Sequence, residues 1–134
     1  MQHYDLSNWT VVIVDDEPDS LEVLCEVLEM NGATVKAAES GEEAIRLLSE
    51  ARPTVILTDI SMPHMDGYQL LFRLRKLDGL ATVPVIALTA HAMRGDKELI
   101  LESGFNGYIT KPLRLDTLIP KIFENVPSLK PASQ

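Results

Sequence analysis

Stretches suited to buried β-strands alternate with stretches of helical periodicity along almost the whole chain, and this alternation limits the possible folds. Each strand-like stretch is short, apolar and bounded by turn residues, which is typical of strands covered on both faces. The alternation predicts an α/β fold with a doubly wound, five-stranded parallel sheet and helices on both faces. We expect strands at residues 10–14, 34–38, 55–59, 83–89 and 107–110, and helices at about 18–31, 41–52, 67–78, 90–103 and 115–125.

Individual residues refine three of the helix starts. Glu17 precedes Pro18, and an acid there suits the positive end of a helix. Ser40 and Glu43 have the spacing of a capping box, which predicts a helix start. Pro120 lies inside the last helical stretch, where a proline removes a backbone donor and clashes with the previous turn. We therefore expect the last helix to start late or to kink.

Composition and length exclude several classes of protein. The 134 residues indicate one domain, which we divide into an N-terminal extension (1–9), a folded domain (10–125) and a C-terminal tail (126–134). A formal net charge of -8 argues against direct binding of nucleic acid, which requires a basic surface. Cys25 is the only cysteine, so we expect no internal disulfide and a reducing, cytoplasmic location. No apolar run reaches membrane-spanning length, so we expect no membrane association.

Polar side chains lie at the ends of four of the expected strands. Asp15 and Asp16 follow the first strand, Asp59 ends the third, Thr89 ends the fourth, and Lys111 follows the fifth. Each of them alone could be a helix cap, a strand residue or a solvated surface residue. The C-terminal ends of parallel strands lie along one edge, where open α/β sheets bind their ligands. We therefore expect these five side chains to meet in one crevice.

This set of side chains predicts a particular chemistry. Three carboxylates at close range raise one another's pKa values or require a cation. An all-oxygen site with few protein ligands suits Mg²⁺, with Mn²⁺ as a substitute. Such an ion leaves positions for phosphate oxygens, and Lys111 and the Thr89 hydroxyl could hold further oxygens. Asp59, on the central strand, is the candidate nucleophile that would form an aspartyl phosphate.

The chain contains four motifs that, in their order along the sequence, resemble those of the receiver domain of two-component response regulators. The resemblance runs from about Thr10 to Asn125 and assigns residues 10–125 to a receiver domain. It implies the strand order 2-1-3-4-5 of the flavodoxin-like, CheY-like fold. The motifs are Val14-Asp15-Asp16-Glu17, Thr58–Gly67, Leu88-Thr89-Ala90 and Tyr108-Ile109-Thr110-Lys111-Pro112.

The resemblance also implies a role for each matching position of the crevice. Asp59 would accept a phosphoryl group from the phosphohistidine of a histidine kinase or a histidine phosphotransfer protein. Asp16 and Asp59 would bind Mg²⁺ directly, Asp15 would bind it through water, and Ser61 would use its backbone carbonyl. Lys111 would pair with the phosphoryl group. The chain would not be an enzyme in the usual sense, because it would catalyse only its own phosphorylation and dephosphorylation.

Other positions would transmit the change or support the site. Thr89 would move toward the phosphate and Tyr108 would turn inward behind it. This switch would bias the face made by the fourth helix, fifth strand and fifth helix, where a downstream protein would bind. Structural roles would fall to Pro63, Gly67 and Pro112, the last in a cis peptide bond with Lys111.

The sequence leaves several alternatives open. The chain could be a single-domain regulator that acts as a monomer or weak dimer, a receiver excised from a hybrid histidine kinase, or a scaffold that is never phosphorylated. A phosphatase of the haloacid dehalogenase type also uses a strand-end Asp with Thr, Lys and Mg²⁺, but Ser61 stands where that family has a second Asp. Ser61 and His91 flank the site in the receiver pattern and could tune the lifetime of the phosphate.

Overall fold

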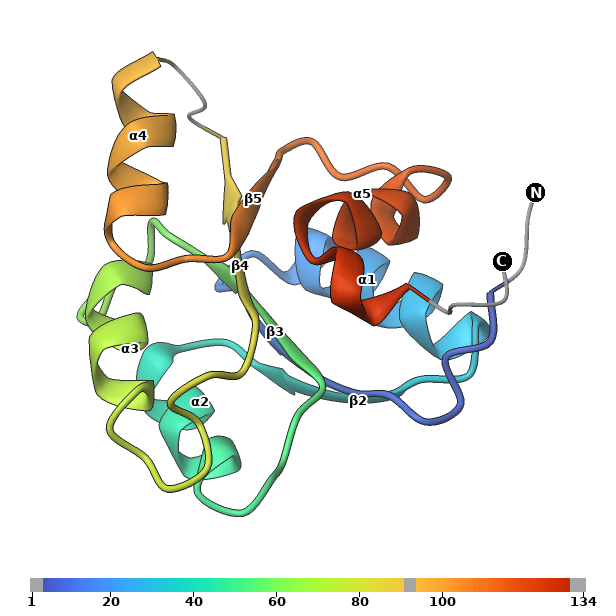
Figure 1. Cartoon of the computed structure of the whole chain (residues 1–134), viewed down its shortest axis with the longest axis horizontal. Coiled ribbons are helices and arrows are strands. Elements are labelled where there is room, and N and C mark those ends of the chain that lie inside the picture. Colours follow the sequence, from blue (N-terminus) through green and yellow to red (C-terminus); the bar gives the residue numbers. More distant parts are fainter. Residues whose placement is uncertain (1–3, 91–93, 131–134) are drawn as a thin grey trace.

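Strands and helices alternate along the chain as expected, and the fold class is confirmed (Figure 1). A computed structural model describes residues 4–90 and 94–130. The strands are β1 (Thr10–Val14), β2 (Thr34–Ala38), β3 (Val55–Asp59), β4 (Val85–Thr89) and β5 (Gly107–Thr110). The helices are α1 (Pro18–Met30), α2 (Gly41–Leu48), α3 (Gly67–Leu74), α4 (Arg94–Glu102) and α5 (Leu118–Asn125), followed by the short 3₁₀ helix η1 (Pro127–Leu129).

The five strands form one parallel sheet in the order β2-β1-β3-β4-β5, as the resemblance implies. All residues of the central strand β3 are buried, and so are those of β4. Val14 lies beside Thr58 and Asp59 lies beside Leu88 in the ladder. The C-terminal ends of β1, β3 and β4 are therefore neighbours along one edge of the sheet.

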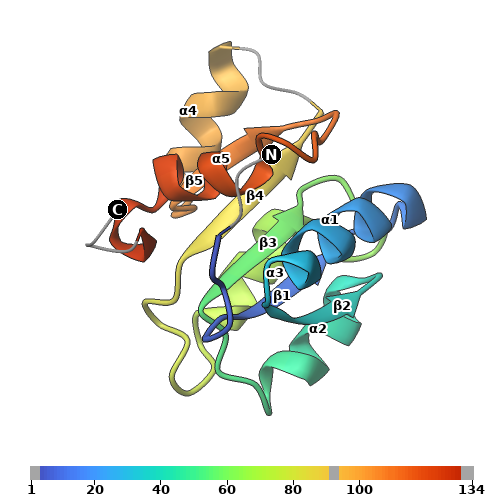
Figure 2. The same cartoon turned by 90° about the vertical axis from the view of Figure 1, so that its right-hand side faces the viewer.

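Helices cover both faces of the sheet (Figures 1 and 2). Successive strand side chains point to opposite faces. Val11 and Ile13 accordingly pack in one apolar cluster with residues of α1 and α5. Val12 and Val14 pack in a second cluster with residues of α2, α3 and α4. The two clusters hold the sheet rigidly between two helical layers, and this fixes the direction of every strand end.

The segment before β1 packs against the domain. Leu6 is 1% exposed, and its amide donates to the Asn31 carbonyl at 2.8 Å. The rings of Tyr4 and Trp9 meet the ring of Phe123 edge to face, with centroids 5.6 and 5.8 Å apart. The described part of the predicted extension, residues 4–9, thus contributes to the core beside α1 and α5.

Several element boundaries differ from the sequence-based expectation. α5 starts at Leu118, which confirms the predicted late start, and Pro120 lies in the first turn, where helix amides lack partners in any case. α3 ends at Leu74, and the chain continues in tighter turns in which the Lys76 and Leu77 amides donate three residues back. β4 starts at Val85 rather than at the expected Val83. Pro84 lies just before the strand because a proline has no amide hydrogen to donate to the ladder.

Two further helix limits differ. α2 ends at Leu48, and in the described residues α4 starts at Arg94. The expected start of α4 falls partly on residues 91–93, which lie outside the described residues. Ser40 caps α2 as predicted, because its Oγ accepts from the Glu43 amide at 3.1 Å. Within residues 4–90 and 94–130, none of the helices has the length and apolar character needed to cross a membrane.

We predict that Gly67→Ala will destabilise the domain by about 1–3 kcal/mol, because the added carbon has no space. A Cβ at Gly67 would lie 2.6 Å from the Asp59 carbonyl oxygen and 2.8 Å from the Ile60 Cα, and neither backbone atom can rotate away. Urea unfolding followed by circular dichroism measures the change. Gly95→Ala is the control, because a Cβ there meets no described atom within 4 Å and alanine favours a helix. Equal midpoints for the two variants would contradict the prediction.

Candidate functional site

The ammonium group of Lys111 lies among three carboxylates at the C-terminal edge of the sheet. Its Nζ is 2.6 Å from Glu17 Oε1, 3.0 Å from Asp15 Oδ2 and 3.3 Å from Asp59 Oδ2. Asp15 follows β1, Asp59 ends β3, and Lys111 follows β5. The sheet therefore brings together residues that are far apart in the sequence, as the strand-end pattern predicts.

Backbone hydrogen bonds fix these strand ends. The Asp15 amide donates to the Ala38 carbonyl at 3.1 Å, and the Lys111 amide donates to the Thr89 carbonyl at 2.8 Å. The Lys111–Pro112 peptide bond is cis. Each of the charged side chains is thus carried by main chain that the sheet or its continuation holds in place.

The site is buried, and burial controls its electrostatics. Asp15 is fully buried and Asp59 is 5% exposed. Burial, followed by the charge of Asp15, raises the pKa of Asp59 to about 6, and Lys111 opposes this rise without cancelling it. Burial by itself would lower the pKa of Lys111, but its contacts with Glu17, Asp15 and Asp59 outweigh burial and raise that pKa. The isolated site therefore carries more negative charge than one ammonium can balance.

The donor atoms fit a hard divalent cation. Asp15, Glu17 and Asp59 each offer a carboxylate oxygen, and these atoms lie within 4.8 Å of one another. Asp16 Oδ1 is buried and has no hydrogen-bond partner among the described residues. Asp15 Oδ2 contacts Lys111 as an ion pair but makes no aligned hydrogen bond. Buried oxygens without donors and an all-oxygen set of this kind suit Mg²⁺.

Glu17 is the member of the cluster that the sequence did not identify. Its position before Pro18 was explained by the helix end, and Glu17 is indeed the N-cap residue of α1, but its side chain makes no capping hydrogen bond. Instead its Oε1 lies 2.6 Å from Lys111 Nζ, although the Glu17 side chain is 62% exposed. The available signal in the sequence is an acid three residues beyond the end of β1.

The remaining predicted residues lie around this cluster. Thr89 is 4% exposed at the end of β4. Tyr108 is half-buried in β5 and packs against the second apolar cluster, which lies between the sheet and helices α2, α3 and α4. The Ser61 amide donates to Asp59 Oδ1 at 3.3 Å. His91 lies outside the described residues.

The loop after Asp59 makes a tight turn before α3. The Met65 amide donates to the Pro63 carbonyl at 2.8 Å, and His64 between them has φ 69. This is a three-residue turn with a positive φ, which is a strained arrangement for a non-glycine residue. Gly67 then packs directly on the Asp59 carbonyl, so α3 begins in contact with the backbone of the central carboxylate.

A hollow adjoins the cluster on the side of Glu17 and Lys111, while Asp15 and Asp59 are not among its lining residues. Its volume is about 410 Å³, and Glu17, Ala90 and Lys111 are among its lining residues. Asp59 Oδ2 lies 3.3 Å from the ammonium of Lys111, so an anion bound to Lys111 would lie beside this buried carboxylate.

Comparison with known proteins identifies a family. The family model described as "Response regulator receiver domain" matches residues 11–123. Over 119 residues the chain is 35% identical to the polar-differentiation response regulator DivK of Brucella anthropi, covering 89% of this chain and 94% of that protein. Over 114 residues it is 39% identical to the sensor histidine kinase RcsC of Escherichia coli, covering 85% of this chain but only 12% of that kinase.

A solved structure agrees with these matches. The receiver domain of a sensor histidine kinase from Pseudomonas aeruginosa, described with a magnesium ion coordinated in its active-site cleft, superposes with a TM-score of 0.78. The two sequences are 32% identical, and the match covers 87% of this chain and 95% of the other.

We predict that Asp59→Asn will stabilise the metal-free protein at pH 7.5 but not at pH 4. The raised pKa means that the folded state holds the Asp59 proton more tightly than the unfolded state, so ionisation of Asp59 reduces stability as pH rises from about 4 through 6. The gain at pH 7.5 should be on the order of 1 kcal/mol after solvent screening. Denaturant unfolding in chelator measures it.

The control for this measurement is Asp78→Asn in an exposed turn, which should have the same small effect at both pH values. An Asp59→Asn variant that is no more stable than the wild type at pH 7.5 would show that Asp59 is not destabilised by its surroundings.

Proposed function

The chain belongs to the response regulator receiver domain family, and from this membership we propose that Asp59 accepts a phosphoryl group from a phosphohistidine. The observation that carries the proposal is the position of Asp59, buried at the end of β3 with its Oδ2 3.3 Å from the Lys111 ammonium, which also contacts Asp15. Receiver domains of response regulators interact with histidine kinases and with downstream targets. The phosphoryl donor would thus be a histidine kinase or a histidine phosphotransfer protein.

We propose Mg²⁺ as the cofactor, with Mn²⁺ able to replace it. Asp16 and Asp59 would bind it directly, Asp15 through water, and Ser61 through its carbonyl. The unpartnered Asp16 Oδ1 supports the place of Asp16 in this ligand set, and the clustered Asp15 and Asp59 oxygens support theirs. Asp16 is not among the described carboxylates that lie within 4.8 Å of one another. When bound, the ion neutralises charge on the carboxylates and on the phosphoryl oxygens. Glu17, whose oxygen lies within the same cluster, would remain paired with Lys111.

The proposed reaction is an in-line transfer to a carboxylate. An Asp59 oxygen forms a bond to phosphorus while the bond from phosphorus to the donor's imidazole nitrogen breaks, and its electron pair stays on that nitrogen. Lys111 then exchanges contacts with carboxylates for a contact with a phosphoryl oxygen. The Thr89 hydroxyl, at the neighbouring strand end, takes another oxygen.

We propose that the output surface is the face made by α4, β5 and α5. Leu99 and Leu101 on α4 are 52% and 51% exposed, which supports binding of a downstream protein there. Thr89 and Tyr108 would link the phosphate to this face through β4 and β5. Phosphorylation would shift a population between two states, limited by the difference in phosphate contacts between them.

The same chemistry would serve a separate regulator or part of a kinase, because matched relatives include both kinds of protein. We propose a cytoplasmic monomer or weak dimer that does not bind nucleic acid itself. The net charge of -8 supports the last point. A scaffold that is never phosphorylated is the principal alternative.

We predict that acetyl phosphate with Mg²⁺ will add one phosphoryl group to the wild type and none to Asp59→Asn, measured by intact mass. Asp78→Asn, an equal loss of charge in an exposed turn, should be labelled like the wild type. Chelator should abolish labelling. An unlabelled wild type, beside a control receiver that is labelled in the same experiment, would refute the phosphoacceptor role and favour the scaffold.

We further predict that Glu17→Gln will be labelled a few times faster than the wild type at low salt. The change frees Lys111 for the phosphoryl oxygen and removes a negative charge at the entrance. The advantage should shrink at high salt because exposed charges are screened. Glu22→Gln on α1 is the matched control. Slower labelling, together with weaker Mg²⁺ binding, would instead identify Glu17 as a metal ligand.

A further inference from the structure

The outer side of α3 carries an aromatic side chain that the folded domain leaves uncovered. Phe72 is 66% exposed, more than any other exposed large hydrophobic residue described. Residues four apart lie on one stripe of a helix. Tyr68 therefore shares the stripe of Phe72, and Gln69 and Arg73 form the adjacent stripe. Lys76 lies in the turn just after α3, with its ammonium over the Phe72 ring. We call these five residues the α3 surface.

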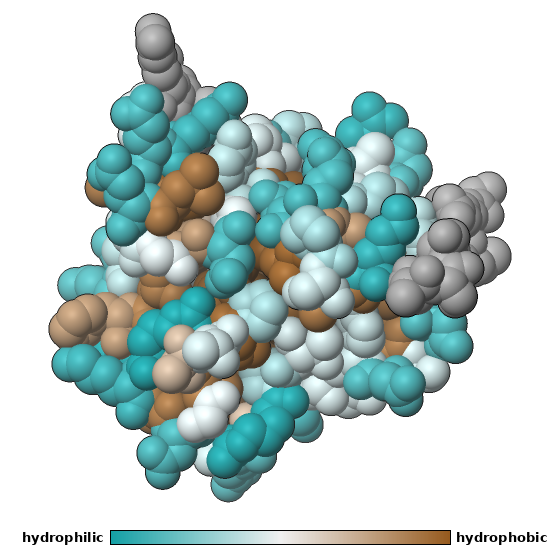
Figure 3. Space-filling view, viewed as in Figure 1, coloured by the Kyte–Doolittle hydropathy of each residue, from teal (hydrophilic) through white to brown (hydrophobic). Residues whose placement is uncertain are grey.

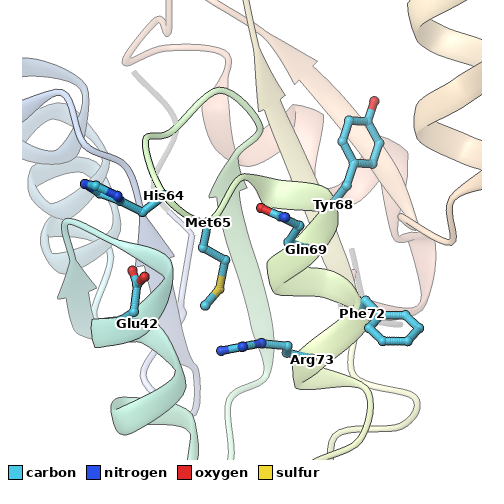
Figure 4. A pocket seen from close by; sticks show the side chains of 7 residues that line it. All are labelled: Glu42, His64, Met65, Tyr68, Gln69, Phe72 and Arg73. Carbon is cyan, nitrogen blue, oxygen red and sulfur yellow. The ribbon is translucent and has the colours of Figure 1, made fainter.

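Hollows flank Phe72 on both sides. Toward α2, a hollow of about 420 Å³ is lined by residues that include Glu42, Met65, Phe72 and Arg73. Figure 4 shows Met65 between Glu42 on α2 and Arg73 on α3, with the Phe72 ring on the other side of α3. Toward α4, a second hollow of about 460 Å³ is lined by Phe72 and, among others, by Ser103 and Gly104, which directly follow α4. The α3 surface is thus a ridge between two depressions.

Apolar and polar areas adjoin on this side of the molecule. Figure 3 shows brown and tan surface over α3 and α4, bordered by hydrophilic side chains. The ammonium of Lys76 lies 4.0 Å from the centre of the Phe72 ring, and this contact shields part of one face of the ring. The high exposure of Phe72 remains despite this contact, so the domain itself does not cover the ring.

The charge of the α3 surface is opposite to that of the whole protein. Residues 67–77 contain no acid, whereas the chain as a whole has a net charge of -8. Arg73 and Lys76 are exposed, and neither forms an ion pair within the described part of the chain. Arg75 is already engaged within the domain, because its guanidinium donates hydrogen bonds to the Leu80 and Val83 carbonyls and to Asn106 Oδ1. Two cationic side chains without ion-pair partners among the described residues therefore border the exposed ring.

We propose that the α3 surface binds an acidic amphipathic helix of a partner protein. Two depressions on either side of one ridge accept apolar side chains spaced three or four residues apart on a helix. Carboxylates beside those side chains meet Arg73 and Lys76, and the basic charge on an acidic domain selects an acidic partner. The five residues of this surface belong neither to the carboxylate cluster nor to the proposed output face, although the hollow toward α4 adjoins that face.

The test uses the unphosphorylated protein, so it is independent of the phosphoacceptor role. The probe is a capped synthetic peptide of about four helical turns, with leucines on one face and glutamates beside them. Its binding is followed by amide chemical shifts of labelled protein at low salt, up to millimolar peptide. The expected result is a saturable set of shifts confined to α3 and the two hollows.

Variants and a second peptide make the result decisive. Phe72→Ser should weaken binding about fivefold or more, and the double variant Arg73→Gln, Lys76→Gln should weaken it and flatten its salt dependence. Leu99→Ser, a change at another exposed apolar residue, on α4, should leave the affinity unchanged, and thermal unfolding checks that each variant is folded. A peptide with lysines in place of the glutamates should not bind.

Three outcomes would overturn the proposal. They are no α3 shifts at millimolar peptide, equal binding of the lysine peptide, and unchanged affinity in Phe72→Ser. Shifts centred on α4 would also overturn it and would assign the peptide to the other face.

Discussion

The contact of one ammonium with three carboxylates is the interaction on which this site depends. Lys111 Nζ lies within 3.3 Å of oxygens from Glu17, Asp15 and Asp59, and two of these carboxylates are almost completely buried. Buried like charges repel strongly unless a counter-charge is present. The ammonium joins the end of β5 to the ends of β1 and β3, yet it leaves a surplus of negative charge. Burial, and after it the charge of Asp15, raises the pKa of Asp59, and the surplus of negative charge fits a divalent cation.

The fold creates this contact through the direction of its strands. A parallel sheet places all its C-terminal ends on one edge, and the two helical layers prevent those ends from shifting. The approach of Gly67 to the Asp59 carbonyl adds a second constraint, because α3 starts on the backbone of the central carboxylate. A change in the charge at Asp59 therefore acts on a rigid frame with little freedom to absorb it locally.

The surfaces around this frame differ in chemistry. α4 presents exposed leucines at the proposed output face. α3 presents an exposed phenylalanine beside cations without ion-pair partners among the described residues. The basic, aromatic surface on α3 thus contrasts with the acidic charge of the whole chain.

The sequence alone determined the fold class, the strand order through its family resemblance, and the edge of the sheet at which Asp15, Asp59 and Lys111 come into contact. These follow from hydrophobic period and strand direction, which are local or topological properties. Only the tertiary structure decided that Glu17 contacts Lys111, a residue 94 positions away, because that contact depends on the path of α1 relative to β5. It also decided where α3 ends and that Phe72 stays uncovered. Periodicity tells which residues share a helix face, but the spacing between neighbouring helices decides which face reaches solvent.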